Sequence, residues 1–120
     1  MIQLLLHLLG DYIFQTSKQA FNKTKKGFFG FYQCFLHCLS YSLPFLLITN
    51  FLNVILIFIF HFILDRTNII AHLIALKNGE NNIENFGYPK ELSKDFSKFL
   101  YIITDNTLHL IINFLIIKYI

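Results

Sequence analysis

Apolar and polar positions divide the chain into four long apolar stretches joined by two polar stretches and one short link. The apolar stretches cover about residues 1–17, 31–48, 53–76 and 96–117, and the polar stretches about 18–30 and 77–94. Within each apolar stretch a few polar residues recur at a spacing of four, which places them on one face of a helix. The pattern predicts an all-α fold of four helices, in one domain over residues 1–120.

Each predicted helix carries one pair of polar side chains a helical turn apart. Three pairs join a histidine to an aspartate, and the fourth joins a histidine to a tyrosine. The pairs are His7 and Asp11, His37 and Tyr41, His61 and Asp65, and Asp105 and His109. All four lie at a similar depth along their helices. We therefore expect the polar faces to meet in one site inside the bundle.

The composition favours a bundle that spans a membrane. Hydrophobic residues make up 55% of the chain and charged residues 14%, against roughly 25% charged residues in ordinary globular proteins. The mean hydropathy is +0.54, and no acidic residue lies between Tyr12 and Leu64. The alternative is a small, very apolar soluble helical bundle. The lipid bilayer is the expected partner, and so small a bundle leaves a homo-oligomer open.

The lysines indicate an orientation in that membrane. Eight of the ten basic residues lie in or beside the two polar stretches. Basic residues flanking apolar spans mark the cytoplasmic side, so both long loops are expected in the cytoplasm and both termini outside. Lysines placed beside apolar runs also make the net charge of +3 a poor sign of nucleic-acid binding, and no nucleic-acid partner is expected.

Aspartates inside a membrane must face inward and find partners. Each one exposed to lipid at the centre of a helix costs about 2.5–3.5 kcal/mol. Histidine nitrogens and aspartate oxygens are ligands for zinc and other first-row metals. The candidate ligands are His7, Asp11, His37, His61, Asp65, Asp105 and His109. These exceed the four of a structural zinc site, so some would support the ligands, or two metals bind.

A divalent metal, zinc first, is thus the expected cofactor, and the leading hypothesis is a metal-dependent hydrolase. An open position on the metal would activate water for attack on a lipid or phosphorylated substrate. An aspartate left off the metal, Asp65 or Asp105, would act as the general base. Two alternatives stay open: a metal-free hydrogen-bonded network that holds the helices together, and a path for protons or ions.

Further residues extend the polar faces or border them. Gln15, Tyr41 and Asn113 are expected to support the ligands. Arg66 adjoins Asp65 but points about 100° away on a helix, where it can pair with a carboxylate or bind an anionic substrate such as a phosphate. Cys34 lies on the His37 face, where apolar packing is favoured over ligation.

Two small or rigid residues predict features of the packing. Gly10, beside Asp11, would let a neighbouring helix approach closely. Pro44 is expected to kink the second helix, because its ring clashes with the preceding turn and it lacks a backbone donor.

The ordered polar motifs resemble one family along nearly the whole chain. These are His7-Leu8-Leu9-Gly10-Asp11-Tyr12-x-x-Gln15, His37-x-x-x-Tyr41, His61-Phe62-x-x-Asp65 and Asp105-x-x-x-His109. The set is similar to domain of unknown function 3307, a family of small membrane proteins of bacteria and their phages. The resemblance implies a membrane location, here the bacterial inner membrane, and these polar positions, but no established activity.

A second similarity concerns spacing alone. The His-x-x-x-Asp pairs are similar to those of membrane metal-dependent hydrolases that act on lipids or amides, which is an analogy and does not fix the function. The chain lacks the serine-rich phosphate-binding motif of lipid phosphatases, which argues against that family.

Overall fold

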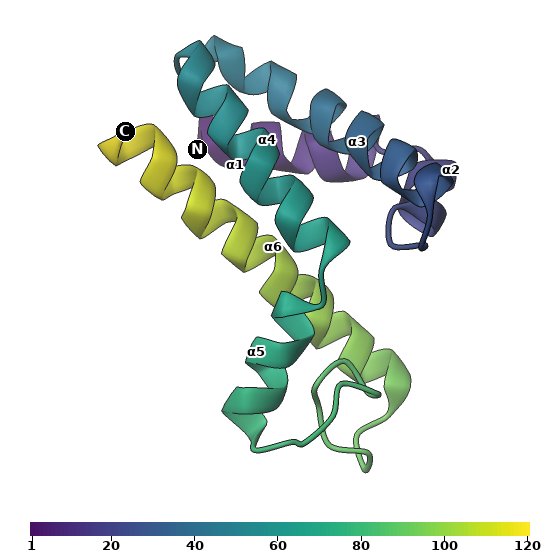
Figure 1. Cartoon of the computed structure of the whole chain (residues 1–120). Coiled ribbons are helices and arrows are strands. Elements are labelled where there is room, and N and C mark those ends of the chain that lie inside the picture. Colours follow the sequence, from purple (N-terminus) through teal and green to yellow (C-terminus); the bar gives the residue numbers. More distant parts are fainter. The chain divides into compact units, whose positions relative to one another are not determined.

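The computed structural model describes residues 1–120, and every regular element in it is a helix (Figure 1). The α-helices are α1 (Ile2–Leu8), α2 (Ser17–Asn22), α3 (Phe28–Ser42), α4 (Phe51–Arg66), α5 (Ile69–Asn78) and α6 (Lys94–Tyr119). A π-helical segment, Leu9–Phe14, continues α1, and a 3₁₀ segment, Leu43–Leu47, continues α3. The chain forms two compact units, residues 1–66 with 109–120 and residues 67–108. The predicted all-α class is confirmed.

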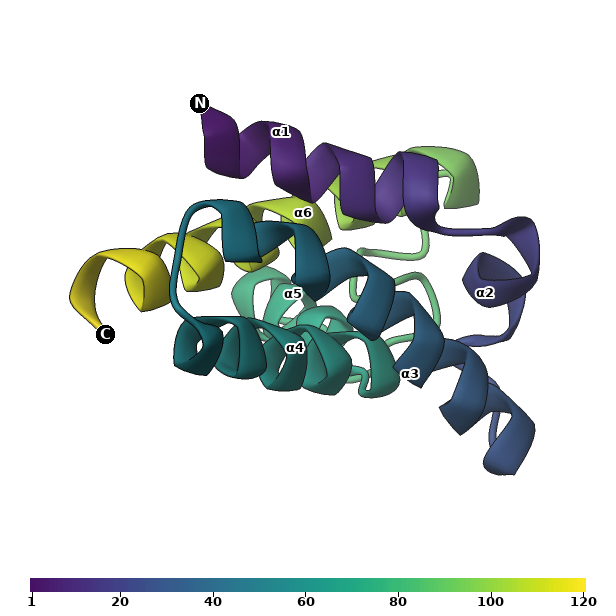
Figure 2. The ribbon, with the colours of Figure 1, turned by 90° about the horizontal axis from the view of Figure 1, so that it is seen from above.

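The helix hairpin α3–α4 is the centre of the first unit. Figure 2 shows α3 and α4 side by side and running in opposite directions. α3 ends at Ser42 because Pro44 cannot continue the α-helical hydrogen bonding, and the chain tightens into the 3₁₀ segment, as the position of the proline predicts. Asn50 then caps α4, its Oδ1 accepting a hydrogen bond from the Asn53 amide at 2.9 Å.

The first helix packs closely against this hairpin at Gly10. A Cβ atom at this position would lie 2.4 Å from Cδ2 of Tyr41, so only glycine fits without movement of the ring. The predicted close approach at Gly10 is confirmed. The π-helical turn that follows α1 contains Asp11, and such turns frequently occur at functional sites because they redirect side chains.

Two expectations about helix boundaries are wrong. The third apolar stretch is not one helix over 53–76, because it breaks at Thr67 and Asn68 into α4 and α5. The break lies at Asn68, whose carbonyl accepts a hydrogen bond from the His72 amide at 3.0 Å while its own backbone leaves the helical region. The first polar stretch is not all loop, since it contains α2. A capping box between Thr16 and Gln19 caps the N-terminus of this helix.

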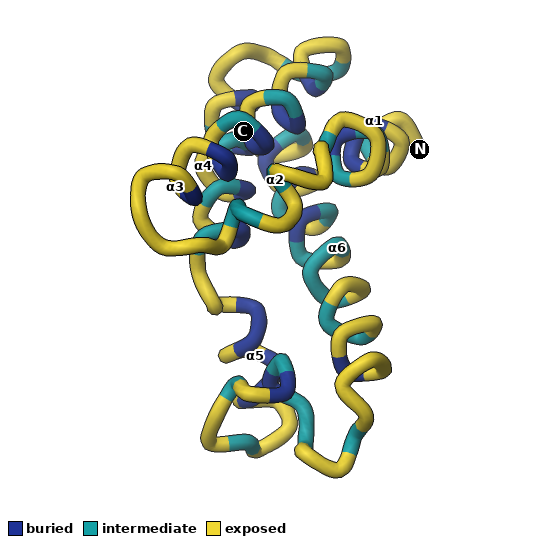
Figure 3. Tube along the Cα trace, turned by 90° about the vertical axis from the view of Figure 1, so that its right-hand side faces the viewer, coloured by how far each residue is buried: buried dark blue, intermediate teal, exposed yellow.

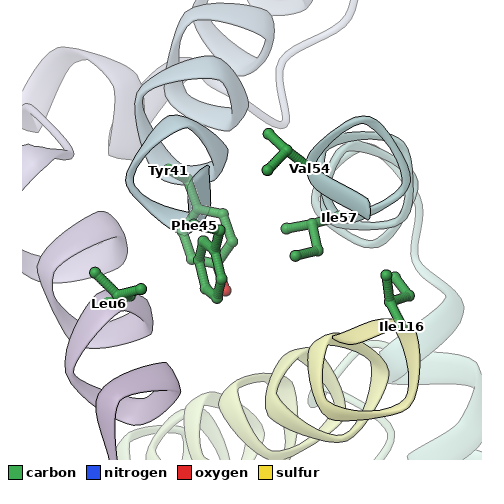
Figure 4. Close-up of a cluster of buried hydrophobic side chains, with 6 residues drawn as sticks. All are labelled: Leu6, Tyr41, Phe45, Val54, Ile57 and Ile116. Atoms are coloured by element: carbon green, nitrogen blue, oxygen red, sulfur yellow. The ribbon is translucent and has the colours of Figure 1, made fainter. Parts of the chain in front are cut away.

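Apolar side chains from four α-helices and the 3₁₀ segment form the core of the first unit. Figure 4 shows Tyr41 and Phe45 at the middle of this cluster, with side chains from the neighbouring helices around them. The buried members are Leu6, Tyr41, Phe45, Val54, Ile57 and Ile116. This cluster holds α1, α3, α4 and the end of α6 in place beside the polar site.

The second unit is tied together by its turns. Gly79 ends α5 with a left-handed conformation, φ +70°. Gly87 lies so close to α5 that a Cβ would be 2.3 Å from the Ala71 carbonyl oxygen. The buried Asn85 side-chain amide donates to the carbonyls of Pro89 and Leu92 at 2.8 and 3.0 Å. These hydrogen bonds give two backbone carbonyls of the loop before α6 a partner.

By length and composition, one helix is able to cross a membrane, α6, and a second span exists only if α4 and α5 count as one broken span. The four spans expected from the sequence are not supported. The apolar segment Ile2–Phe14 and the 15-residue α3 are too short, because about 20 helical residues are needed to cross roughly 30 Å. Figure 3 shows that much of the surface of each helix is exposed.

Candidate metal centre

Two buried histidines face each other across the α3–α4 hairpin. The Nε2 atoms of His37 and His61 lie 3.0 Å apart. Two N–H groups cannot point at each other at this distance, so at least one ring presents a lone pair. When both rings carry their proton on Nδ1, two lone pairs face the same space. That is the state in which histidine binds a metal ion.

Two carboxylates flank this histidine pair. Asp11 Oδ1 lies 3.3 Å from His37 Nε2 and 3.5 Å from His61 Nε2. Asp65 Oδ2 lies at the same two distances from these nitrogens, 3.3 and 3.5 Å. Each carboxylate therefore completes a triangle of three ligand atoms, and the two triangles share the His37–His61 edge.

The carboxylate sides of these triangles have the length that a zinc ion requires, and the shared histidine side is slightly shorter. Tetrahedral zinc binds histidine nitrogen and carboxylate oxygen at about 2.0–2.2 Å, so neighbouring ligand atoms lie about 3.3–3.6 Å apart. The sides of the Asp11 triangle are 3.0, 3.3 and 3.5 Å. Asp11, His37 and His61 therefore need little movement to hold one ion, with the fourth position left open.

One oxygen of this centre lacks a donor. Asp11 Oδ1 is buried and has no hydrogen-bond partner, which is costly for a carboxylate. Asp65, in contrast, accepts a hydrogen bond from Lys23 Nζ at 2.8 Å. Two carboxylates thus face one ammonium group. The remaining negative charge is left for a histidine proton or a metal ion to balance.

A buried hydrogen-bonded chain runs from Asn113 through Tyr41 to His7, which lies beside the second oxygen of Asp11. Asn113 Nδ2 donates to Tyr41 Oη at 2.7 Å, and Tyr41 Oη lies 2.6 Å from His7 Nδ1. Because the hydroxyl accepts from Asn113, its proton can be donated to His7 Nδ1, which leaves the proton of His7 on Nε2. His7 Nε2 lies 3.6 Å from Asp11 Oδ2. Tyr41 and Asn113 thus hydrogen-bond within the buried polar group. Their expected role of supporting metal ligands stays a prediction.

Ring packing positions His61. Its Nδ1 has no hydrogen-bond partner, but its ring stacks on Tyr41 with 3.7 Å between centroids. The His109 ring also lies against the His61 ring, with 4.1 Å between their centroids. His109 Nε2 is 3.8 Å from Asp65 Oδ1, so it borders the Asp65 triangle at a longer distance.

Six of the predicted ligands lie in the first unit, namely His7, Asp11, His37, His61, Asp65 and His109. Asp105 belongs to the second unit, half-buried on α6 one turn before His109. Its proposed role as a ligand or base stays a prediction.

Lys23 is a member of the centre that the sequence pattern did not indicate. It is one of four lysines in a polar stretch, and nothing in the sequence separates it from the others. The lysine follows α2, its side chain is 20% exposed, and its ammonium pairs with Asp65. Gln15, with its amide oriented to satisfy both neighbours, accepts from Lys23 Nζ at 3.1 Å and donates to the Asp11 carbonyl at 3.2 Å.

Arg66 fastens the loop that carries Lys23. Its Nη1 donates to the backbone carbonyls of Lys23 and Lys25, both at 2.8 Å. These contacts hold the segment after α2 over the centre. The expected contact of Arg66 with an anionic substrate stays a prediction.

Comparison with known proteins gives a family for the chain. A family model described as "Protein of unknown function (DUF3307)" matches residues 1–120. No curated protein and no solved structure matches the chain. The match covers every helix and every residue of the His/Asp centre, so this chain belongs to the DUF3307 family of proteins of unknown function.

Proposed function

We propose that the protein is a membrane-embedded, metal-dependent hydrolase that acts on a lipid or phosphorylated substrate. The triangle of Asp11 Oδ1, His37 Nε2 and His61 Nε2 carries the proposal, because its sides fit zinc and its carboxylate oxygen lacks a donor. Catalytic zinc sites have three protein ligands and an open position. A zinc ion held by these residues would supply an activated water as the nucleophile.

The charged residues around the triangle, Asp65 and Lys23, have positions suited to roles in such a reaction. Asp65 Oδ2, beside both histidine nitrogens, is placed either to complete the metal shell or to accept a proton as general base. The ammonium of Lys23 lies next to Asp65 on a segment held by Arg66, so it offers a positive charge to an anionic substrate at this centre. A cation and a metal side by side favour a phosphate or another anionic group.

The distribution of polarity supports a membrane location. The interior of the first unit buries His7, His37, His61 and Asp65, while large apolar side chains such as Leu47 at 81% and Phe51 at 67% are exposed. Soluble proteins rarely expose so much contiguous apolar surface. With α6 as the span, Lys94 and Lys98 mark its cytoplasmic end, and the long loops lie on that side of a bacterial inner membrane.

Hydrolysis by zinc-loaded protein tests the proposal. Protein purified in detergent is stripped with chelator, reloaded with zinc and assayed on phosphoesters, phospholipids and amides. We expect release of product from at least one class, and a loss of at least about 100-fold with Asp11→Asn, which keeps the shape of the side chain but weakens the metal ligand. A folded, zinc-loaded protein that cleaves none of these classes would rule out the hydrolase.

The ion pair between Lys23 and Asp65 favours a second candidate, a metal-free network that holds the helices together. Its Nζ–Oδ2 distance of 2.8 Å is that of a charge-assisted hydrogen bond, and it neutralises Asp65 without a metal. In this case the hydrogen-bonded chain from Asn113 to His7 is structural or carries protons.

Lys23→Met separates the two candidates. If Lys23 competes with a metal for Asp65, its removal raises zinc affinity by about tenfold or more, because a like charge at this distance opposes binding by more than about 1 kcal/mol. If the network is metal-free, the variant leaves Asp65 buried without its partner and costs about 3–5 kcal/mol of stability. Zinc titration and denaturant unfolding give the two answers, with Lys26→Met, an exposed lysine of the same loop, as control.

A further inference from the structure

Two cysteines lie one turn apart on α3, beside the His/Asp centre. Cys34 and Cys38 are both free thiols with 0% exposure, and their Sγ atoms are 3.8 Å apart. Together with a carboxylate oxygen of Asp65 they form a group in which every ligand atom is within 4.8 Å of the others. All three residues are buried.

The spacing of the sulfurs is the spacing of metal-bound thiolates. Zinc binds cysteine sulfur at about 2.3 Å, so two thiolates on one tetrahedral ion lie about 3.8 Å apart. The observed Sγ–Sγ distance, 3.8 Å, equals this value. Cys34 and Cys38 can therefore bind one ion together without a change of the helix that carries them.

The third member of the group argues against packing alone. Buried cysteines commonly act as small apolar residues, and the sequence favours that role for Cys34. Here, however, the thiols adjoin a charged carboxylate that is buried with them. Two thiolates and a carboxylate are a ligand set for borderline or soft cations such as Zn²⁺, Cd²⁺ or Co²⁺ used as a probe.

We propose that Cys34, Cys38 and Asp65 form a second ion site, selective for thiophilic cations such as Zn²⁺, adjacent to the His/Asp centre. Asp65 is common to both sets, with Oδ2 beside His37 and His61. A carboxylate shared between two ions is a usual arrangement in helical bundles that bind two metals. The thiolate site does not depend on the proposed hydrolase. It gives Asp65 a role when Asp11, His37 and His61 bind a separate ion.

Cobalt titration of the reduced protein tests the proposal. Thiolate–Co²⁺ bonds give an intense charge-transfer absorption in the near ultraviolet, whereas nitrogen and oxygen ligands give only weak visible bands. We expect both signals in the unmodified protein. Cys34→Ser and Cys38→Ser should each reduce the charge-transfer absorption severalfold or remove it while the visible bands of the His/Asp centre remain. Asp11→Asn should do the reverse.

The unmodified protein alone is able to overturn the inference. If both thiols react as free cysteines after reduction, the helical content is intact, and saturating Co²⁺ gives no charge-transfer absorption, the cysteines are packing residues. A thiolate signal without hydrolysis would contradict the proposed hydrolase and support the thiolate site. A visible His/Asp signal without the thiolate signal would do the opposite.

Discussion

Replacing His61 by alanine is expected to lower the affinity of the His/Asp centre for zinc by at least about 100-fold. Loss of a group that merely hydrogen-bonds a ligand costs about 10- to 100-fold, and a ligand itself costs no less. His61 Nε2 belongs to both triangles, since it lies 3.5 Å from Asp11 Oδ1 and from Asp65 Oδ2. Its removal therefore damages both possible ion positions at once. Metal analysis after gel filtration and competition with a zinc indicator measure the effect.

His72→Ala is the matched control for this experiment. His72 is exposed on α5 in the second unit, so its loss should leave zinc binding unchanged. Since His61 is buried, circular dichroism must show that its variant keeps the helical content. His61→Gln, which keeps a polar side chain in the space, serves if alanine unfolds the protein. Equal zinc content in folded His61→Ala and unmodified protein would eliminate the proposed centre.

Gly10→Ala is expected to destabilise the first unit by about 1–3 kcal/mol, the usual cost of inserting an atom into a close-packed site. The added Cβ would lie 2.4 Å from the ring of Tyr41. The ring must move, and its hydroxyl then loses its contacts with His7 and Asn113. We therefore expect weaker zinc binding as well, because His7, which lies beside Asp11, loses the hydrogen bond that holds its ring.

Denaturant unfolding and zinc titration measure the two effects of Gly10→Ala. Ile13→Ala, at a 69% exposed position of the same π-helical segment, is the control and should change stability by no more than about 0.5 kcal/mol. Unchanged stability together with unchanged zinc affinity in Gly10→Ala would show that the contact with Tyr41 does not position the centre.

The candidate centre was largely accessible from helical spacing. A period of 3.6 residues puts His61 and Asp65 on one face, and burial of charge requires that such faces turn inward. Spacing within one helix says nothing of which faces meet. Only the packing of the helices shows that Asp11 and His37, which come from different elements, lie 3.3 Å apart.

The position of Lys23 in the centre cannot be predicted from helical spacing. Its ammonium reaches Asp65 only because α2 turns the chain back and Arg66 binds the carbonyls of Lys23 and Lys25. These contacts link residues more than 40 positions apart, and long-range contacts leave no local period in a sequence. The break between α4 and α5 is hard to predict for a related reason. Thr67 and Asn68 lie between two apolar stretches, and no glycine or proline marks the end of the helix.

Local sequence pattern is enough to predict the all-helical class, the polar face of each apolar stretch, the interruption of the second helix at Pro44 and the need for a small residue at Gly10. Each of these follows from the chemistry of neighbouring residues along one helix. Only the tertiary structure decided which faces converge, that Lys23 joins them, and that Cys34 and Cys38 lie within ligand distance of Asp65. Those facts depend on how separate helices pack, and packing is fixed by the whole set of contacts and not by any one segment.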